Sequence, residues 1–262
     1  MDKGDEPLYQ RLTDIDASTH QEIDGVVKSM RTSFKDQEYF ENYILLNKED
    51  IEFYEDGLKS GATANDRIPA VKRQIFTTGL HTVIAKYSAG HSVQEIQNNF
   101  KEVINALKEG WQSEGKNIQF DDYILMLWML SLAVLLDIDD SDFRKIITVL
   151  DESRHKDGIY DLIIWSKFSD RNKVSELTYP DEFGFLKTFY ETKNTEDLKN
   201  YLDNVWYKKM KPTYWFDNDK NKNEVFFGYW SFESAAFVKI ADAEDSSLKN
   251  QKYYPYDWVH WK

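Results

Sequence analysis

The chain has 262 residues, of which 41% are hydrophobic and 15% aromatic, and it carries a formal net charge of −13 and no cysteine. So much apolar side chain excludes a disordered protein, and the lack of cysteine excludes disulfides, thiolate metal sites and cysteine nucleophiles. An acidic surface repels phosphates, so it predicts basic proteins as partners, with no nucleic acid and no membrane among them.

The ends and the apolar runs of the chain indicate where the protein resides. The first residues, MDKGDEPLYQ, contain no apolar run of the kind that a secretory signal needs. The longest apolar stretch, residues 123–136, has 14 residues, whereas a membrane-spanning helix needs about 20. We therefore expect a cytoplasmic protein.

Helical patterns fill the N-terminal region, because only 11 glycines and 5 prolines interrupt the whole chain. Residues 60–67 (SGATANDR) are expected to form a loop, and Pro69 suits the first turn of a helix. Ser92 and Glu95 form a capping box at another helix start. The helices predicted here span residues 20–35, 36–58, 69–87 and 93–110.

The stretch 111–119 (WQSEGKNIQ) is the best boundary between two halves, and a buried helix over 120–136 follows it. Residues 211–223 are expected to form a polar loop, and residues 253–262 an extended aromatic tail. The sequence thus predicts an all-α, compact bundle of about 9–10 helices, with regions 1–118 and 119–262 packed as one unit. The further helices predicted here span residues 141–153, 158–169, 181–192, 195–210 and 225–241.

Motifs for cofactor and metal chemistry are missing, so we predict no cofactor and no metal. The sequence has no glycine-rich phosphate loop, no G-x-S-x-G and no H-E-x-x-H. Its five histidines never stand three or four residues apart, which rules out a helical metal pair. They are His20, His81, His91, His155 and His260.

Two acidic runs resemble calcium-binding loops, at residues 137–142 and 217–222. Such a loop needs glycine at its sixth position and glutamate at its twelfth. The sixth residues here are Asp142 and Lys222, and the twelfth are Thr148 and Gly228. Neither run is therefore expected to bind calcium, but the first is a secondary candidate for a protein contact, through Asp137, Asp139, Asp140 and Asp142.

One motif points to catalysis. Pro180 and Asp181, followed by Glu191 and Lys193, spell the PD…(D/E)xK pattern of metal-dependent nucleases, in which carboxylates bind Mg²⁺ and the lysine stabilises developing charge. Those residues should lie on adjacent strands, whereas the sequence around them indicates a helix. We therefore keep a nuclease as an alternative interpretation only.

The C-terminal region carries a resemblance to a known family. Residues 226–240 (FFGYWSFESAAFVKI) and 253–261 (YYPYDWVHW) resemble the C-terminal signature of the PoNi family, the immunity proteins of polymorphic nuclease effectors. Residues 85–90 (AKYSAG) and the capped helix after them are similar to that family's N-terminal region.

This resemblance implies an all-helical fold, no enzymatic activity, and a basic DNase toxin as the partner. It does not supply a binding site, because the recognisable residues look structural. Glu233 and Asp257 are expected to be satisfied polar groups that hold the aromatic tail on the last helix.

The residues themselves suggest a binding site on the helix predicted over 36–58. At 100° per residue, Phe40, Ile44, Asn47, Ile51, Tyr54 and Leu58 form a core-facing stripe. Residues 1–56 hold 15 acidic and 6 basic groups, and several of the carboxylates gather on the opposite face around one leucine. The predicted protein-binding residues are Glu38, Glu41, Leu45, Glu49, Glu52 and Asp56.

The leading hypothesis is an immunity protein that binds a cognate DNase toxin and covers its DNA-binding and active-site face with this acidic surface. The alternatives are the metal-dependent nuclease and a non-catalytic helical scaffold without a toxin partner. The sequence leaves open which toxin is cognate and whether the protein forms oligomers.

Overall fold

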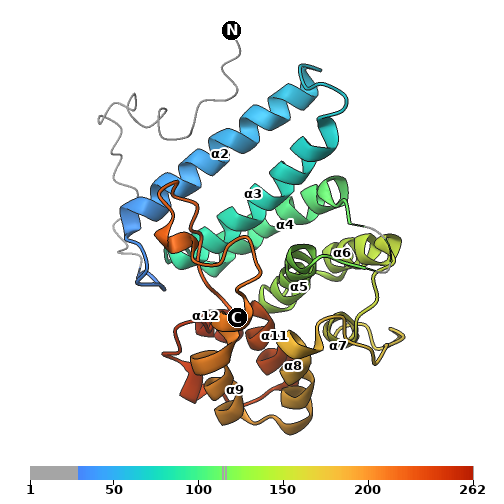
Figure 1. Ribbon diagram of the computed structural model, residues 1–262, viewed down its shortest axis with the longest axis vertical. Coiled ribbons are helices and arrows are strands. Elements are labelled where there is room, and N and C mark those ends of the chain that lie inside the picture. The colour runs from blue at the N-terminus through green and yellow to red at the C-terminus, as the bar shows by residue number, and fades with distance from the viewer. Residues whose placement is uncertain (1–28, 114, 116, 262) are drawn as a thin grey trace.

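The computed structural model describes residues 29–113, 115 and 117–261, and within them every regular element is a helix. The all-α fold class predicted from the sequence is confirmed (Figure 1). The elements of the N-terminal region are α2 (Gln37–Lys59), α3 (Ile68–Ser88) and α4 (Val93–Gly110). Those that follow are α5 (Phe120–Leu135), α6 (Asp140–Ser153), α7 (Gly158–Trp165), α8 (Pro180–Thr192), α9 (Thr195–Tyr201), a π-helical turn (Leu202–Trp206), α10 (Tyr207–Lys209), α11 (Phe232–Ala241) and α12 (Tyr256–His260).

Side-chain caps set several helix starts. Asp36 accepts a hydrogen bond from the Tyr39 backbone N–H at the start of α2, and Ser92 accepts one from Glu95 at the start of α4. Such caps satisfy backbone donors that have no partner within the helix. These two residues therefore fix where α2 and α4 begin.

The centre of the molecule is α5, of which nearly every residue is buried. It packs against α6, α7 and α11, while α3 packs against α2 and α4. Because α5 is surrounded, its apolar character reflects burial in a protein core. No helix among the described residues is both long and apolar enough to cross a membrane.

The two regions meet through the segment that precedes α11. The Tyr39 hydroxyl on α2 donates to the Phe226 carbonyl at 3.0 Å and accepts from the Phe226 backbone N–H at 2.8 Å. Ser88 at the end of α3 donates to the Phe227 carbonyl at 2.8 Å, and the Trp230 indole donates to Ser88 at 2.9 Å. This segment is thus fastened along α2 and α3.

Three predicted elements differ from the structure. Residues 29–36 are irregular, so no helix occupies that end of 20–35, and residues 20–28 lie outside the described part. Residues 225–231 have no regular secondary structure and only 232–241 are helical, because tertiary contacts hold the preceding segment. The predicted tail is not wholly extended, since residues 256–260 form α12.

Candidate protein-binding surface

The predicted acidic side of α2 lies on the surface. Its members, here called the acidic strip, are all exposed: Glu38, Glu41, Leu45, Glu49, Glu52 and Asp56. Leu45 keeps 45% of its surface exposed among these carboxylates. The helical phase read from the sequence therefore placed these residues on the solvent side of α2.

The other side of α2 faces α3. Phe40 is fully buried, whereas Ile44, Ile51 and Tyr54 are only partly so. The Asn47 amide donates to the Thr82 hydroxyl on α3 at 3.1 Å. Because α2 packs mainly on this one helix, it lies at the edge of the molecule and leaves a long exposed face (Figure 1).

The strip carboxylates differ in how they are paired. Glu41 accepts from Gln37 at 2.7 Å and lies 3.3 Å from Nε2 of the buried His91. Glu52 lies 3.8 Å from Lys48, an exposed pair, which is worth little in water. Glu38 and Glu49 have no ion pair within the described residues. The strip thus keeps a negative field with few internal cations.

Exposed apolar side chains gather around the same helix. The large hydrophobic residues exposed in the described part of the chain are Leu45, Phe53 at 65%, Tyr214 at 47% and Val225 at 36%. The first two lie on α2, and the other two lie on the 211–227 segment that Tyr39 ties to α2. Clustered apolar groups with a polar rim are typical of interaction sites. Phe53 was not among the binding residues predicted from the sequence. Its position outside the core-facing stripe was the feature that could have predicted its exposure.

The secondary acidic cluster is engaged within the fold. Asp139 caps α6, accepting from the Asp142 backbone N–H at 2.9 Å and from Ser141 at 2.7 Å, and these hydrogen bonds lower its pKa below the usual range. Asp142 pairs with Lys145 at 2.7 Å. Asp140 pairs with Lys167 at 3.3 Å, and Asp137 is exposed after α5. The run is therefore mainly a helix cap.

The nuclease-like motif lies on one helix instead of two strands. Asp181 is in the first turn of α8, Glu191 is near its end, and Lys193 follows it. Ten helical residues separate the carboxylates by about 15 Å along the axis, too far apart to share one metal ion. Within the described residues, no group of three or more acidic or histidine side chains is placed to hold a metal.

Glu233 and Asp257 are satisfied, but they do not join the tail to the last helix as predicted. Glu233 is buried and accepts from the Trp206 indole at 2.6 Å and from the Ser231 hydroxyl at 2.7 Å. Asp257 instead pairs with Arg31 at 2.6 Å, at the other end of the chain. Burial raises the pKa of Glu233 above its ordinary range.

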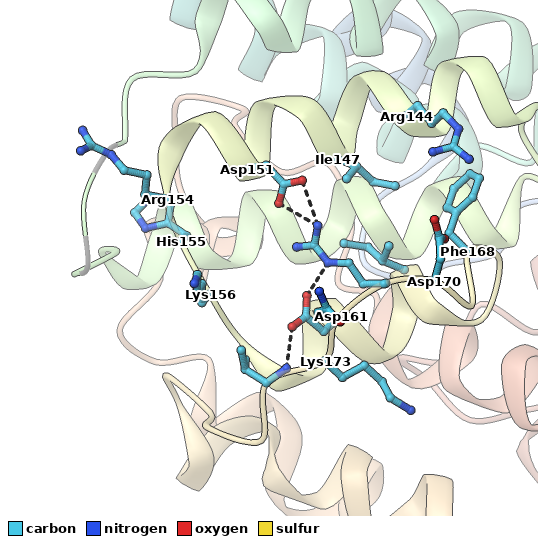
Figure 2. A pocket seen from close by; sticks show the side chains of 14 residues that line it. Arg144, Ile147, Asp151, Arg154, His155, Lys156, Asp161, Phe168, Asp170 and Lys173 are labelled. Carbon is cyan, nitrogen blue, oxygen red and sulfur yellow. Dashed lines mark hydrogen bonds and ion pairs between the residues drawn. The ribbon is translucent and has the colours of Figure 1, made fainter.

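A cleft of about 490 Å³ lies between α6, α7 and the segment after α7, as Figure 2 shows. The Arg171 guanidinium in it donates to Asp151 at 2.8 Å and 2.9 Å and to Asp161 at 2.8 Å. Arg144 lies over the Phe168 ring at 4.2 Å. These contacts fasten the segment to α6 and α7, so we assign the cleft a structural role.

Comparison with known proteins identifies the family. Protein PA2201 from Pseudomonas aeruginosa, known from a crystal structure, shares the fold with a TM-score of 0.65 over 89% of this chain and 90% of its own, at 15% sequence identity. No curated protein matches the chain significantly. The N-terminal model of the PoNe immunity proteins (PoNi) matches residues 31–148, and the C-terminal model matches residues 155–258. The chain therefore belongs to the PoNe immunity protein family, whose members are inhibitors and not enzymes.

Proposed function

We propose that the protein binds a cognate DNase toxin and neutralises it by covering its DNA-binding and active-site face with the acidic strip of α2. Membership of an immunity family supports the inhibitory role. The observation that carries the proposal is the exposure of all six strip residues on one side of a helix at the edge of the molecule.

Charge complementarity is the physical basis. A DNase needs basic groups along its DNA path, because phosphate contacts dominate the affinity for DNA. The strip runs from Glu38 to Asp56, and the 18 steps between these residues span about 27 Å at 1.5 Å per residue. Glu38 and Glu49, which have no ion pair among the described residues, can meet toxin cations without first leaving another partner. Such fields speed association and act less on dissociation.

Apolar contacts would supply much of the affinity. Leu45 is exposed among the carboxylates, and Phe53, which directly follows Glu52 of the strip on α2, has 65% of its surface exposed. Buried anchors at the centre of an interface usually dominate its binding energy, and their loss mainly speeds dissociation. We therefore expect Leu45→Ala to raise the dissociation rate and to leave the association rate nearly unchanged.

The test is toxin-binding kinetics, with a basic nuclease domain as the partner, sought first among the products of the neighbouring genes. Glu38, Glu49 and Glu52 are changed together to lysine, and Glu41 is left because it contacts His91. At low salt we expect association to slow by about tenfold or more and to lose much of its salt dependence. Cells that produce the toxin should lose protection in parallel.

A matched control separates the strip from net charge. Glu191 of α8, Glu196 of α9 and Glu176, four residues before α8, are also exposed. Helices α8 and α9 lie at the opposite end of the molecule from α2 (Figure 1). Their triple change to lysine alters net charge by the same amount and should slow association far less. Equal effects of the two triple variants, or normal association of the strip variant, would show that the toxin does not dock on the strip.

A further inference from the structure

A second cleft opens between α2, α3 and the 211–227 segment, on the side of α2 that is turned toward α3. Its volume is about 560 Å³. Leu46 of α2, Phe227, and the exposed Tyr214 and Val225 give it apolar walls. On α2 the cleft is lined by Leu46, Asn47 and Asp50. Leu46 directly follows Leu45 of the strip in the sequence, so a protein that lies along the strip and extends around α2 at this point can reach the cleft.

The floor of the cleft is neutral. The His81 ring of α3 stacks on the Phe227 ring with 4.1 Å between centroids, and its Nε2 lies 2.6 Å from the Tyr214 hydroxyl. Burial lowers the pKa of His81 well below the usual histidine value, so the ring carries no charge at neutral pH. The floor therefore does not repel an incoming cation.

The lining also offers hydrogen-bond acceptors. Asp50 and Glu224 are two carboxylates at the cleft, against one lysine, Lys222. Asn218, which is only 7% exposed, donates from its amide nitrogen to the Val225 carbonyl at 2.9 Å. Its buried Oδ1 accepts no hydrogen bond from the described residues. A buried acceptor without a donor costs free energy, so an incoming donor would be favoured.

We propose that this cleft receives an arginine or lysine side chain of the toxin, an inference that rests on the proposed function. The aliphatic stem of such a side chain packs against apolar walls while its charged end meets acceptors. Tyr214 provides an aromatic face for the cation, Asn218 provides the unused oxygen, and Glu224 provides the opposite charge. No other common side chain combines an apolar stem with a positively charged donor.

The test introduces a positively charged side chain into the cleft by substitution. Val225→Lys and Val225→Gln add side chains of similar reach that differ in charge, and Val225 is exposed enough to accept either. We expect Val225→Lys to weaken toxin binding by about tenfold more than Val225→Gln. The pair Glu224→Lys and Glu224→Gln, at an exposed position, gives the same comparison if the first pair lowers the melting temperature.

The toxin residue is identified by double-mutant cycles between Tyr214→Ala and single alanine changes of the toxin's surface arginines and lysines. One basic residue should couple strongly to Tyr214, while the others add independently. Equal binding of the lysine and glutamine variants, or coupling of Tyr214 only to an apolar toxin residue, would overturn the proposal. The strip variants are measured in the same experiment. If the cleft variants bind the toxin equally well while the strip variant still slows association, this inference is refuted and the proposed function is not. A toxin that does not bind the unchanged protein refutes the proposed function and this inference with it.

Discussion

Glu233 is a carboxyl group within the core that accepts hydrogen bonds from Trp206 and Ser231. Burial opposes its ionisation and raises its pKa above the ordinary value of 4.5. The folded state then holds a proton that the unfolded chain has already released. Between the unfolded and folded pKa values, the free energy of unfolding must therefore fall as the pH rises.

The prediction is that Glu233→Gln removes this pH dependence. Glutamine keeps an oxygen that can accept from Trp206 and carries no charge, so the variant should melt at a higher temperature than the unchanged protein at about pH 7. The two should converge near about pH 4, where both groups are neutral. Thermal unfolding followed across this range checks the difference, and parallel profiles would mean that Glu233 titrates normally.

Trp258 anchors the end of the chain. Its ring is fully buried against Tyr87, at 4.1 Å between centroids, and Phe232, at 5.1 Å. Trp258→Ala should lower the free energy of unfolding by about 3–5 kcal/mol. Tyr254→Ala should also destabilise the protein, because Tyr254 is buried and its hydroxyl donates a hydrogen bond to Asp245 at 2.7 Å. The partly exposed Tyr256 provides a milder alanine control. A Trp258 variant with an unchanged melting temperature but no toxin binding would place α12 in the interface.

At the scale of elements, α8 decides between the inhibitor and the nuclease. Asp181 and Glu191 stand a helix length apart, so we expect no cleavage of DNA by the purified protein with Mg²⁺ or Mn²⁺. A plasmid-nicking assay measures this, with Glu191→Ala as the matched control. Cleavage that disappears in that variant would revive the nuclease interpretation.

The helices that were predictable from sequence are those with local signals. Ser92 starts α4 where the capping box predicted it, and the apolar run of α5 is buried as expected. The segment 225–231 had a helical composition, but hydrogen bonds from Tyr39 and Ser88 to its carbonyls hold it out of a helix. At Gly228 the φ angle is +134°, and a Cβ there would collide with Ser88 and Trp230. Tyr39 and Ser88 lie more than a hundred residues away in the sequence, so local patterns missed this shape.

The candidate surface also has a part that was predictable from the sequence and a part that was not. The helical phase of α2 was sufficient to place Glu38, Leu45 and Glu52 on the exposed side. The cleft was not predictable, because Tyr214 and Val225 reach it through the tertiary placement of the 211–227 segment. The sequence also predicted a polar loop over residues 211–223, although Trp215 within it is buried. Local periodicity thus predicts which residues share a face of one helix, whereas a cleft between elements can be identified only from the tertiary structure.

At the scale of the molecule, buried contacts connect the two regions. Ser88 connects to Phe227 and Trp230 through buried hydrogen bonds, and Arg31 binds Asp257 while also donating to the carbonyls of Tyr87 and His91 at 3.0 Å each. Separating the regions would expose apolar surface and leave buried polar groups without partners, which costs free energy on both sides.

We therefore expect regions 1–118 and 119–262 to unfold together. Circular dichroism and tryptophan fluorescence should report one coincident thermal transition, as cooperative unfolding requires. All but one of the eight tryptophans lie after residue 118, so fluorescence follows mainly the C-terminal region while circular dichroism follows both. Ser88→Ala, which leaves Trp230 without its acceptor, should lower both signals' midpoints equally, whereas a surface change such as Glu196→Gln should move neither. Two separated transitions, or a Ser88 variant that shifts one signal alone, would show that the regions fold as independent domains.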